Sequence, residues 1–437
     1  MTFFVFSINH DIFACMKKFL LVQIFLSSVA VHASNPQCPL IDAVYKNDFA
    51  WASSIIKNGT DLNCRGSAGI PVLIESIREG AWQIAKLIVD SGADVNIVGI
   101  WEDTPLESTC QREKLDFASY LIERQAKVEF RDSTGASILS RIASSGKLSS
   151  VTYLVSQGAD INSKDDLQRS VIFNAIVSAQ FSPDKPYFEI IQYLLDQGAD
   201  PNAKDFESKS LLFKAVGAKS LELTKLLVSM GADVNAQTNT LDSPLTLASR
   251  RLLGQEFIEY LVNSGALVNQ ANTANETALL FFAGQYRYET IDFLLKNGAD
   301  VNVQSTATGR TPLMESVNAS LDFIDEVRLF VEHGANVNVI DASGRSALIM
   351  AAFRQKTDLG LFLISVGADV NIKTYGYFET PLIVSASYSL NDLAKSLIDH
   401  GADVNAQLNS ATTALMLAKY YGNLWLQEYL ISHGATH

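Results

Sequence analysis

The chain has 437 residues, of which 48% are hydrophobic and 19% charged, and its formal net charge is −13 at neutral pH. This length exceeds what one hydrophobic core normally supports. The apolar content is high enough to exclude an intrinsically disordered chain. The negative charge repels phosphate backbones and acidic membrane surfaces, and no basic run offsets it, so we expect no nucleic acid partner.

The N-terminus has the pattern of a secretory signal. Two lysines precede an apolar run at 19–31, and Val31 and Ala33 stand at the two positions that a signal peptidase reads. Thirteen residues rise only about 20 Å as a helix, so an uncleaved membrane anchor is the weaker alternative. We therefore predict a signal peptide at 1–33, with translation starting at Met16. The mature chain, 34–437, is expected in a bacterial periplasm or outside the cell, without membrane insertion.

The rest of the chain is repetitive. The tag Gly-Ala-Asp-Val-Asn, or a close variant, recurs along it, and seven of the eleven steps between successive tags are 33 residues long. The tags begin at Gly59, Gly92, Gln125, Gly158, Gly198, Gly231, Gly265, Gly298, Gly334, Gly367, Gly401 and Gly434. This period predicts about twelve stacked units rather than several globular domains.

Each unit has the signals of two helices. A Ser/Thr-Pro-Leu motif about twelve residues after the tag, as at Thr104 and Thr380, caps the start of a first helix. A second helix, apolar at helical spacing, runs into the next tag, whose glycine ends it in the left-handed conformation. Gln125 departs from this rule at a cost of about 1 kcal/mol.

These motifs resemble the ankyrin repeat family, whose period is 33 residues and whose helix start is Thr-Pro-Leu-His. The resemblance covers residues 38–437 and implies an all-α ankyrin-repeat solenoid of about twelve stacked helix-turn-helix units with hairpin loops and a concave binding face. One departure is clear, because the histidine position is occupied by other residues, so the usual polar link to neighbouring loops is missing. The substitutes are Glu107, Phe173, Phe213, Thr246, Leu280, Met314, Ile349, Ile383 and Met416.

The first unit carries two cysteines at one edge. Cys38 stands at the first helix start, and Cys64 opens the hairpin that leads to the second unit. We hypothesise a disulfide that pins the terminal repeat and stabilises it by about 3.5 kcal/mol, with two unpaired thiols as the alternative. Cys110 falls in a small-residue position of a first helix and is expected to be buried.

The sequence offers little catalytic chemistry. The recurring Asp-x-Asn pairs, as at Asp94 and Asn96, could bind calcium, but their place after each helix favours loop-stabilising hydrogen bonds. An enzymatic cleft would need convergent polar groups, to which only the seven-residue insertion at 180–186 could contribute. We therefore expect no enzyme, no cofactor and no metal.

Repeat proteins bind through hairpin tips and the exposed side of the first helices. Several predicted tips carry large rings, which are typical interface anchors: Trp101, Phe206, Tyr375, Tyr377 and Phe378. Alternatively, each ring folds back onto its neighbouring loop. Weaker candidates lie in the turns between helices: Tyr187, Phe188, Tyr286 and Tyr288.

The combined pattern predicts a monomeric, non-catalytic scaffold in the bacterial envelope that binds a protein partner through its hairpin tips and concave face. The alternative is a secreted effector that binds or inhibits a host or competitor protein. The sequence does not identify the partner.

Overall fold

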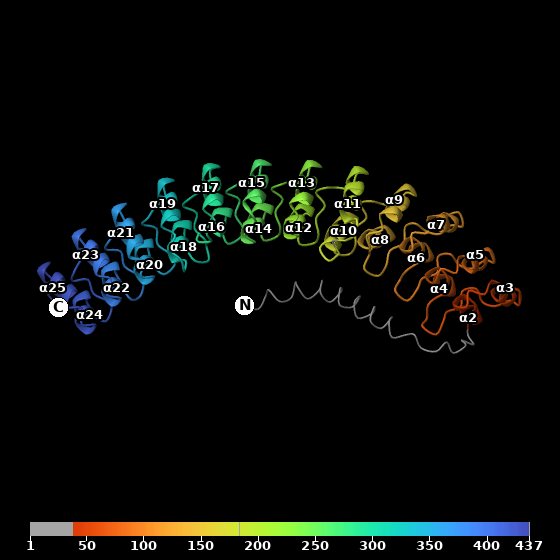
Figure 1. Cartoon of the computed structure of the whole chain (residues 1–437), viewed down its shortest axis with the longest axis horizontal. Coiled ribbons are helices and arrows are strands. Elements are labelled where there is room, and N and C mark those ends of the chain that lie inside the picture. The colour runs from red at the N-terminus through yellow and green to blue at the C-terminus, as the bar shows by residue number, and fades with distance from the viewer. Residues whose placement is uncertain (1–37, 183, 437) are drawn as a thin grey trace. The chain divides into compact units, whose positions relative to one another are not determined.

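The computed structural model describes residues 38–182 and 184–436. The predicted signal peptide, 1–33, lies outside the described residues. The chain divides into two compact units, one up to Asp160 and the other from Ile161. Within the described residues both units consist of helix pairs, twelve pairs altogether, and Figure 1 labels them along the chain.

Unit 1 contains four helix pairs. Its first helices are α2 (Pro39–Tyr45), α4 (Val72–Glu79), α6 (Pro105–Gln111) and α8 (Ile138–Ser144). Its second helices are α3 (Phe49–Lys57), α5 (Trp82–Asp90), α7 (Leu115–Ile122) and α9 (Leu148–Ser156).

Unit 2 contains eight pairs. Its first helices are α10 (Val171–Ala179), α12 (Leu211–Gly217), α14 (Pro244–Arg250), α16 (Ala278–Phe282), α18 (Pro312–Asn318), α20 (Ala347–Phe353), α22 (Pro381–Ser387) and α24 (Ala414–Tyr420). Its second helices are α11 (Tyr187–Asp196), α13 (Leu221–Ser229), α15 (Gln255–Asn263), α17 (Tyr288–Lys296), α19 (Ile324–Glu332), α21 (Thr357–Ser365), α23 (Asn391–Asp399) and α25 (Leu424–Ser432).

The helix signals act as expected. The hydroxyl of Thr104 accepts a hydrogen bond from the amide of Glu107, three residues into α6, and Thr380 caps α22 in the same way. Glycines of the tag follow the second helices with positive φ, as at Gly158 with φ of 86°. Gln125 adopts the same left-handed conformation with φ of 69°, so this repeat ends its helix at a residue with a side chain.

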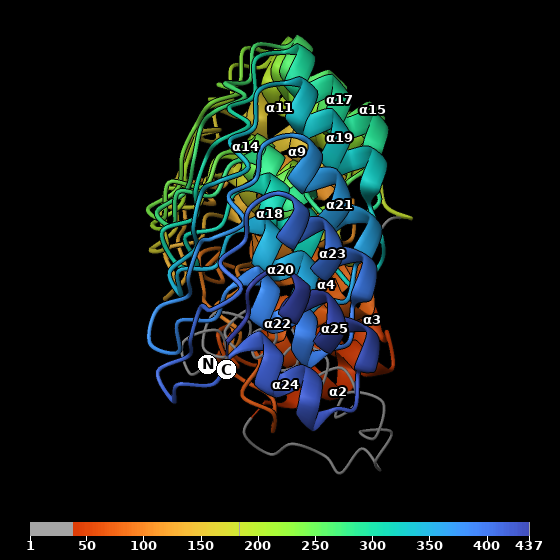
Figure 2. The ribbon, with the colours of Figure 1, turned by 90° about the vertical axis from the view of Figure 1, so that its left-hand side faces the viewer.

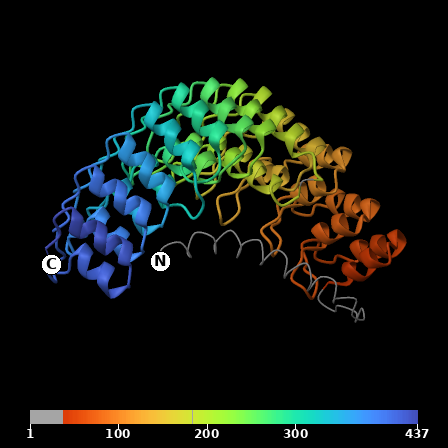
Figure 3. The ribbon, with the colours of Figure 1, turned by 60° about the vertical axis from the view of Figure 1, so that its left-hand side comes forward.

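Equivalent helices of neighbouring pairs pack against one another. In unit 2, α20 contacts α22 and α21 contacts α23, which gives a layer of first helices beside a layer of second helices (Figure 3). Small side chains permit the close approach, since Ala351 and Ala386 are fully buried between larger ones such as Leu348 and Leu363. The hairpins of unit 2 extend from the other side of the first helices, as Figure 2 shows.

Asparagine side chains join successive repeats. Asn371 Nδ2 donates to the carbonyl of Gly401 at 3.0 Å, and its Oδ1 accepts from the amide of Asp403 at 2.8 Å. Asp369 Oδ1 in turn accepts from the Asn371 amide. The same two inter-repeat bonds recur at Asn96, Asn162, Asn202, Asn235, Asn269, Asn302, Asn338 and Asn405. We call these the asparagine clamps, and they link loops that lack the family's histidine.

Candidate functional site

Several hairpins are built around an acidic residue at their first corner, namely Asp132, Asp165, Asp205 and Asp341. Asp341 Oδ1 accepts from the backbone amides of Ser343 and Arg345 at 2.8 and 3.0 Å, while its Oδ2 pairs with the Arg345 guanidinium at 2.8 Å. Burial acts to raise the pKa of Asp341, but the hydrogen bonds from Arg345 and Ser343 outweigh it, and the pKa is lowered. The turn is therefore held by a buried, charged carboxylate.

Backbone hydrogen bonds connect neighbouring tips in unit 2. The amide of Tyr375 donates to the carbonyl of Ser343 at 2.9 Å, and the amide of Asn409 donates to the carbonyl of Tyr377 at 3.3 Å. Likewise the Phe206 amide donates to the Leu167 carbonyl at 3.1 Å. Because backbone groups make these links, the tip side chains are left for other contacts.

The tip between α21 and α22 carries three exposed rings. Tyr375, Tyr377 and Phe378 are 61, 68 and 49% exposed. Tyr375 lies directly over Gly344 in the preceding tip, where an added Cβ would come within 2.9 Å of the ring. The base of this patch is therefore packed, while its outer surface faces solvent.

A second apolar patch crosses three adjacent tips. Phe206 is exposed as predicted, and Leu167 and Leu241 in the tips on either side are exposed too. Neither leucine was identified from the sequence, although both stand in the predicted hairpins. The available signal was their place in the hairpins, since Leu167 lies two residues after the corner Asp165 and Leu241 lies one residue before Asp242 at the far end of its hairpin.

Trp101 differs from the other four predicted anchors. The guanidinium of Arg78 lies 4.3 Å from its ring centroid, and Arg78 also forms an ion pair with Asp103 at 2.8 Å. The tryptophan is only partly exposed, because Arg78 of α4 covers one face of its ring. Among the weaker candidates Tyr187 is buried, whereas Phe188, Tyr286 and Tyr288 are exposed.

Comparison with known families agrees with this architecture. A model of three ankyrin repeats matches residues 73–165, 178–272, 250–339 and 279–374, and a single-repeat model matches 378–409. Together they cover well over half of the chain. The chain belongs to the ankyrin repeat family. Ankyrin repeats are protein-interaction modules, and this coarse function applies to the chain.

Several known proteins resemble parts of the chain. It is 35% identical over 28% of its length to the putative ankyrin repeat protein FPV031 of Fowlpox virus, and 31% identical over 38% to the mouse B-cell lymphoma 3 protein homolog. These matches span only 36 and 37% of the relatives' own lengths. A further match, 30% identical over 28% of the chain, covers 11% of the glycerophosphocholine phosphodiesterase GDE1 of Candida albicans.

The cysteines occupy the first ankyrin repeats. Cys38 and Cys64 have Cα atoms 5.4 Å apart, and the structure joins their sulfur atoms. This Cα separation is ordinary for a disulfide, and whether the protein carries the bond in solution stays a prediction. Cys110 is buried in α6, and burial raises the pKa of its thiol to about 12. A thiol with this pKa stays protonated at neutral pH and is a poor nucleophile.

The Asp-x-Asn pairs of the ankyrin loops are used in hydrogen bonding. At most of the asparagine clamps an aspartate two residues earlier accepts from the asparagine amide, as Asp94 does from Asn96 at 2.8 Å. Residues 38–182 and 184–436 contain no group of three or more His, Cys, Asp or Glu side chains arranged to hold a metal ion. Over the same residues, no helix is both long and apolar enough to cross a membrane.

Proposed function

We propose that this ankyrin protein is an exported, non-catalytic scaffold that holds a protein partner through its hairpin tips and the adjoining concave face. The observation that carries the proposal is the group of exposed rings at Tyr375, Tyr377 and Phe378, fixed on a hairpin whose backbone is bonded to both neighbours. Large aromatic side chains on a rigid support are typical interface anchors, because ordering them costs little entropy.

The site of action belongs to the proposal as well. The signal pattern at 1–33 supports export to the periplasm, and no feature of the described residues favours the effector alternative over it. N-terminal sequencing of the exported protein is expected to give Ser34. Recovery from culture medium or target cells would support the effector alternative, while recovery only from the cytoplasm with an intact N-terminus would contradict export.

Binding is tested with residues 34–437 immobilised and exposed to periplasmic extract and to culture medium. We expect a retained protein whose affinity falls at least tenfold in the double variant Tyr375→Ala/Tyr377→Ala, since each anchor contributes more than about 1 kcal/mol. The matched control is Phe49→Ala, which removes an exposed ring from the second helix α3, away from the hairpin tips and the concave face. Unchanged binding by the tip variant, or equal loss in the control, would refute the proposed surface.

A further inference from the structure

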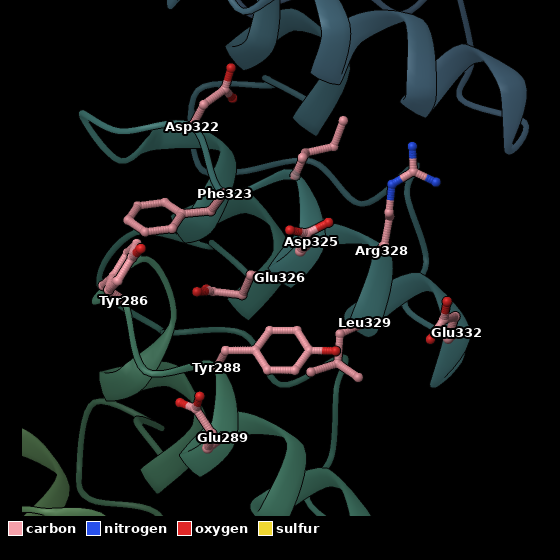
Figure 4. A pocket seen from close by; sticks show the side chains of 11 residues that line it. Tyr286, Tyr288, Glu289, Asp322, Phe323, Asp325, Glu326, Arg328, Leu329 and Glu332 are labelled. Atoms are coloured by element: carbon pink, nitrogen blue, oxygen red, sulfur yellow. The ribbon is translucent and has the colours of Figure 1, made fainter.

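An open groove of about 640 Å³ is lined by residues of the second helices α17 and α19 and of the turns that precede them, and by no hairpin residue. It arises where two connections between first and second helices are long. Five residues separate α16 from α17, and five separate α18 from α19, whereas three separate α20 from α21. The longer turns bring Tyr286 and Phe323 to the rim of the groove (Figure 4).

Aromatic side chains form one wall of the groove. Tyr286 is 80% exposed and its ring centroid lies 6.0 Å from that of the buried Phe323. The exposed ring of Tyr288 lies across the groove from this pair, as Figure 4 shows. Ring faces presented in this way attract cations, because the π-electrons make the face negative.

The remaining lining is acidic. Glu289, Asp322, Asp325 and Glu332 are exposed carboxylates around the groove, and Glu326 lies within it. Of the residues that the structure describes, none forms an ion pair with any of these five, although acidic residues elsewhere in the chain do pair. Arg328, the one basic lining residue, stacks over the Phe362 ring at 4.6 Å.

Glu326 is the distinctive member of the groove. Its side chain is only 3% exposed and points between Tyr286 and Tyr288 (Figure 4). Its Oε1 accepts from the Gly284 amide at 2.6 Å and from the Ser316 hydroxyl, but Oε2 accepts no hydrogen bond within the described residues. Burial raises the pKa of Glu326, although both hydrogen bonds act to lower it. Oε2 is not a fully buried atom and opens into the groove, where a cation would give the carboxylate the positively charged partner that it lacks within the described residues.

We propose that this groove binds the arginine or lysine side chain of a basic protein segment, held between the aromatic wall and the carboxylates. A metal ion fits less well, since no metal-binding group of three or more ligands exists in the described ranges. The groove lies away from the hairpin tips, so this site is additional to the tip surface and does not depend on it.

The probe is a blocked nine-residue glycine-serine peptide with arginine at three alternating positions. Its control is the same peptide with citrulline, which keeps the shape of the side chain and removes the charge. Titration calorimetry with residues 34–437 is expected to show at least tenfold tighter binding of the arginine peptide, and this preference should decrease with added salt. Equal affinity for both peptides, or binding of neither, would overturn the proposal.

Variants locate the binding. Tyr286→Ala and Asp325→Asn should each weaken binding of the arginine peptide about three- to fivefold, and Glu326→Gln about tenfold. Asp392→Asn is the matched control, because Asp392 is an exposed acid at the same position of α23 as Asp325 in α19 but lies outside the groove. Equal loss in Asp325→Asn and Asp392→Asn would show attraction to the acidic surface in general and would overturn the site.

Two further measurements keep the result unambiguous. Glu326→Gln changes a buried group, so circular dichroism and thermal melting must show that this variant keeps the native stack. If it does not, peptide binding by the variant of the exposed residue, Asp325→Asn, decides the test. The tip variant Tyr375→Ala/Tyr377→Ala should bind the peptide as the unmodified chain does. Loss of peptide binding in the tip variant would contradict a binding site separate from the tips. Absence of peptide binding by the groove would not affect the proposal that a partner binds at the hairpin tips.

Discussion

The asparagine clamp at Asn371 provides the sharpest test of how the stack is held. Replacing it with alanine removes the bonds to Gly401 and Asp403, at 3.0 and 2.8 Å. Each neutral hydrogen bond contributes about 0.5–1.5 kcal/mol, and the exposed site favours the lower half of this range. We therefore expect Asn371→Ala to destabilise the interface between the helix pairs α20/α21 and α22/α23 by about 1–2 kcal/mol.

The effect should be local, because each repeat contacts only its neighbours. Hydrogen exchange of the amides in α22 to α25, beyond this interface, should accelerate about 5- to 30-fold, whereas α12 and α13 should be unaffected. Asn371→Asp should be worse than alanine, since a carboxylate oxygen would face the Gly401 carbonyl. The control is Asn297→Ala, because Asn297 Nδ2 bonds only within its own repeat, to Phe293. Unchanged exchange in α22 to α25 would refute the reasoning.

Three other perturbations test the same stack. Gln125→Gly should raise the free energy of unfolding by about 1 kcal/mol, and Gly158→Gln should lower it by a similar amount, because both positions have positive φ. Urea denaturation measures both changes, and a change of the same sign in the two variants would contradict this reasoning. Asp341→Asn should cost about 1–3 kcal/mol at pH 7. Because the folded pKa is lowered, that advantage of the native aspartate exists above its unfolded pKa of about 3.9 and disappears as pH falls through the folded pKa, which urea denaturation at a series of pH values measures. Replacing Cys38 and Cys64 by serine should destabilise the first repeat by about 3.5 kcal/mol, and free thiols at both positions by mass spectrometry would exclude the bond.

The sequence was sufficient for the fold because most units carry the same local signals for the start and end of their helices. Thr104 and Thr380 cap helices where the Ser/Thr-Pro-Leu motif places them, and the tag glycines end the second helices. The clamps were predicted only as loop-stabilising hydrogen bonds. Their partners lie about 30 residues away in the next repeat, so the bonds depend on stacking distance, which the period alone does not provide.

The exposure of individual rings was harder to predict, because it depends on what a neighbouring repeat places beside them. Trp101 is covered since Arg78 stacks on it, whereas Tyr375 rests on a glycine and keeps its outer face free. Tyr187 is buried where α11 begins after the insertion. The groove beside Glu326 depends on two long turns and one buried carboxylate, and no single motif reports that combination.

The atoms that hold neighbouring hairpins together differ from the side chains that the hairpins expose to solvent. Tyr375 and Tyr377 are linked to adjacent tips through a backbone amide and a backbone carbonyl, which alanine retains. Their rings contribute little to the buried core, because both are mostly exposed. Replacing the rings should therefore change the melting temperature little, while the clamps and corner aspartates continue to hold the hairpins. A loss of partner binding in these variants then reports on the contact surface itself, and a comparable loss of stability would show that the rings belong to the stack.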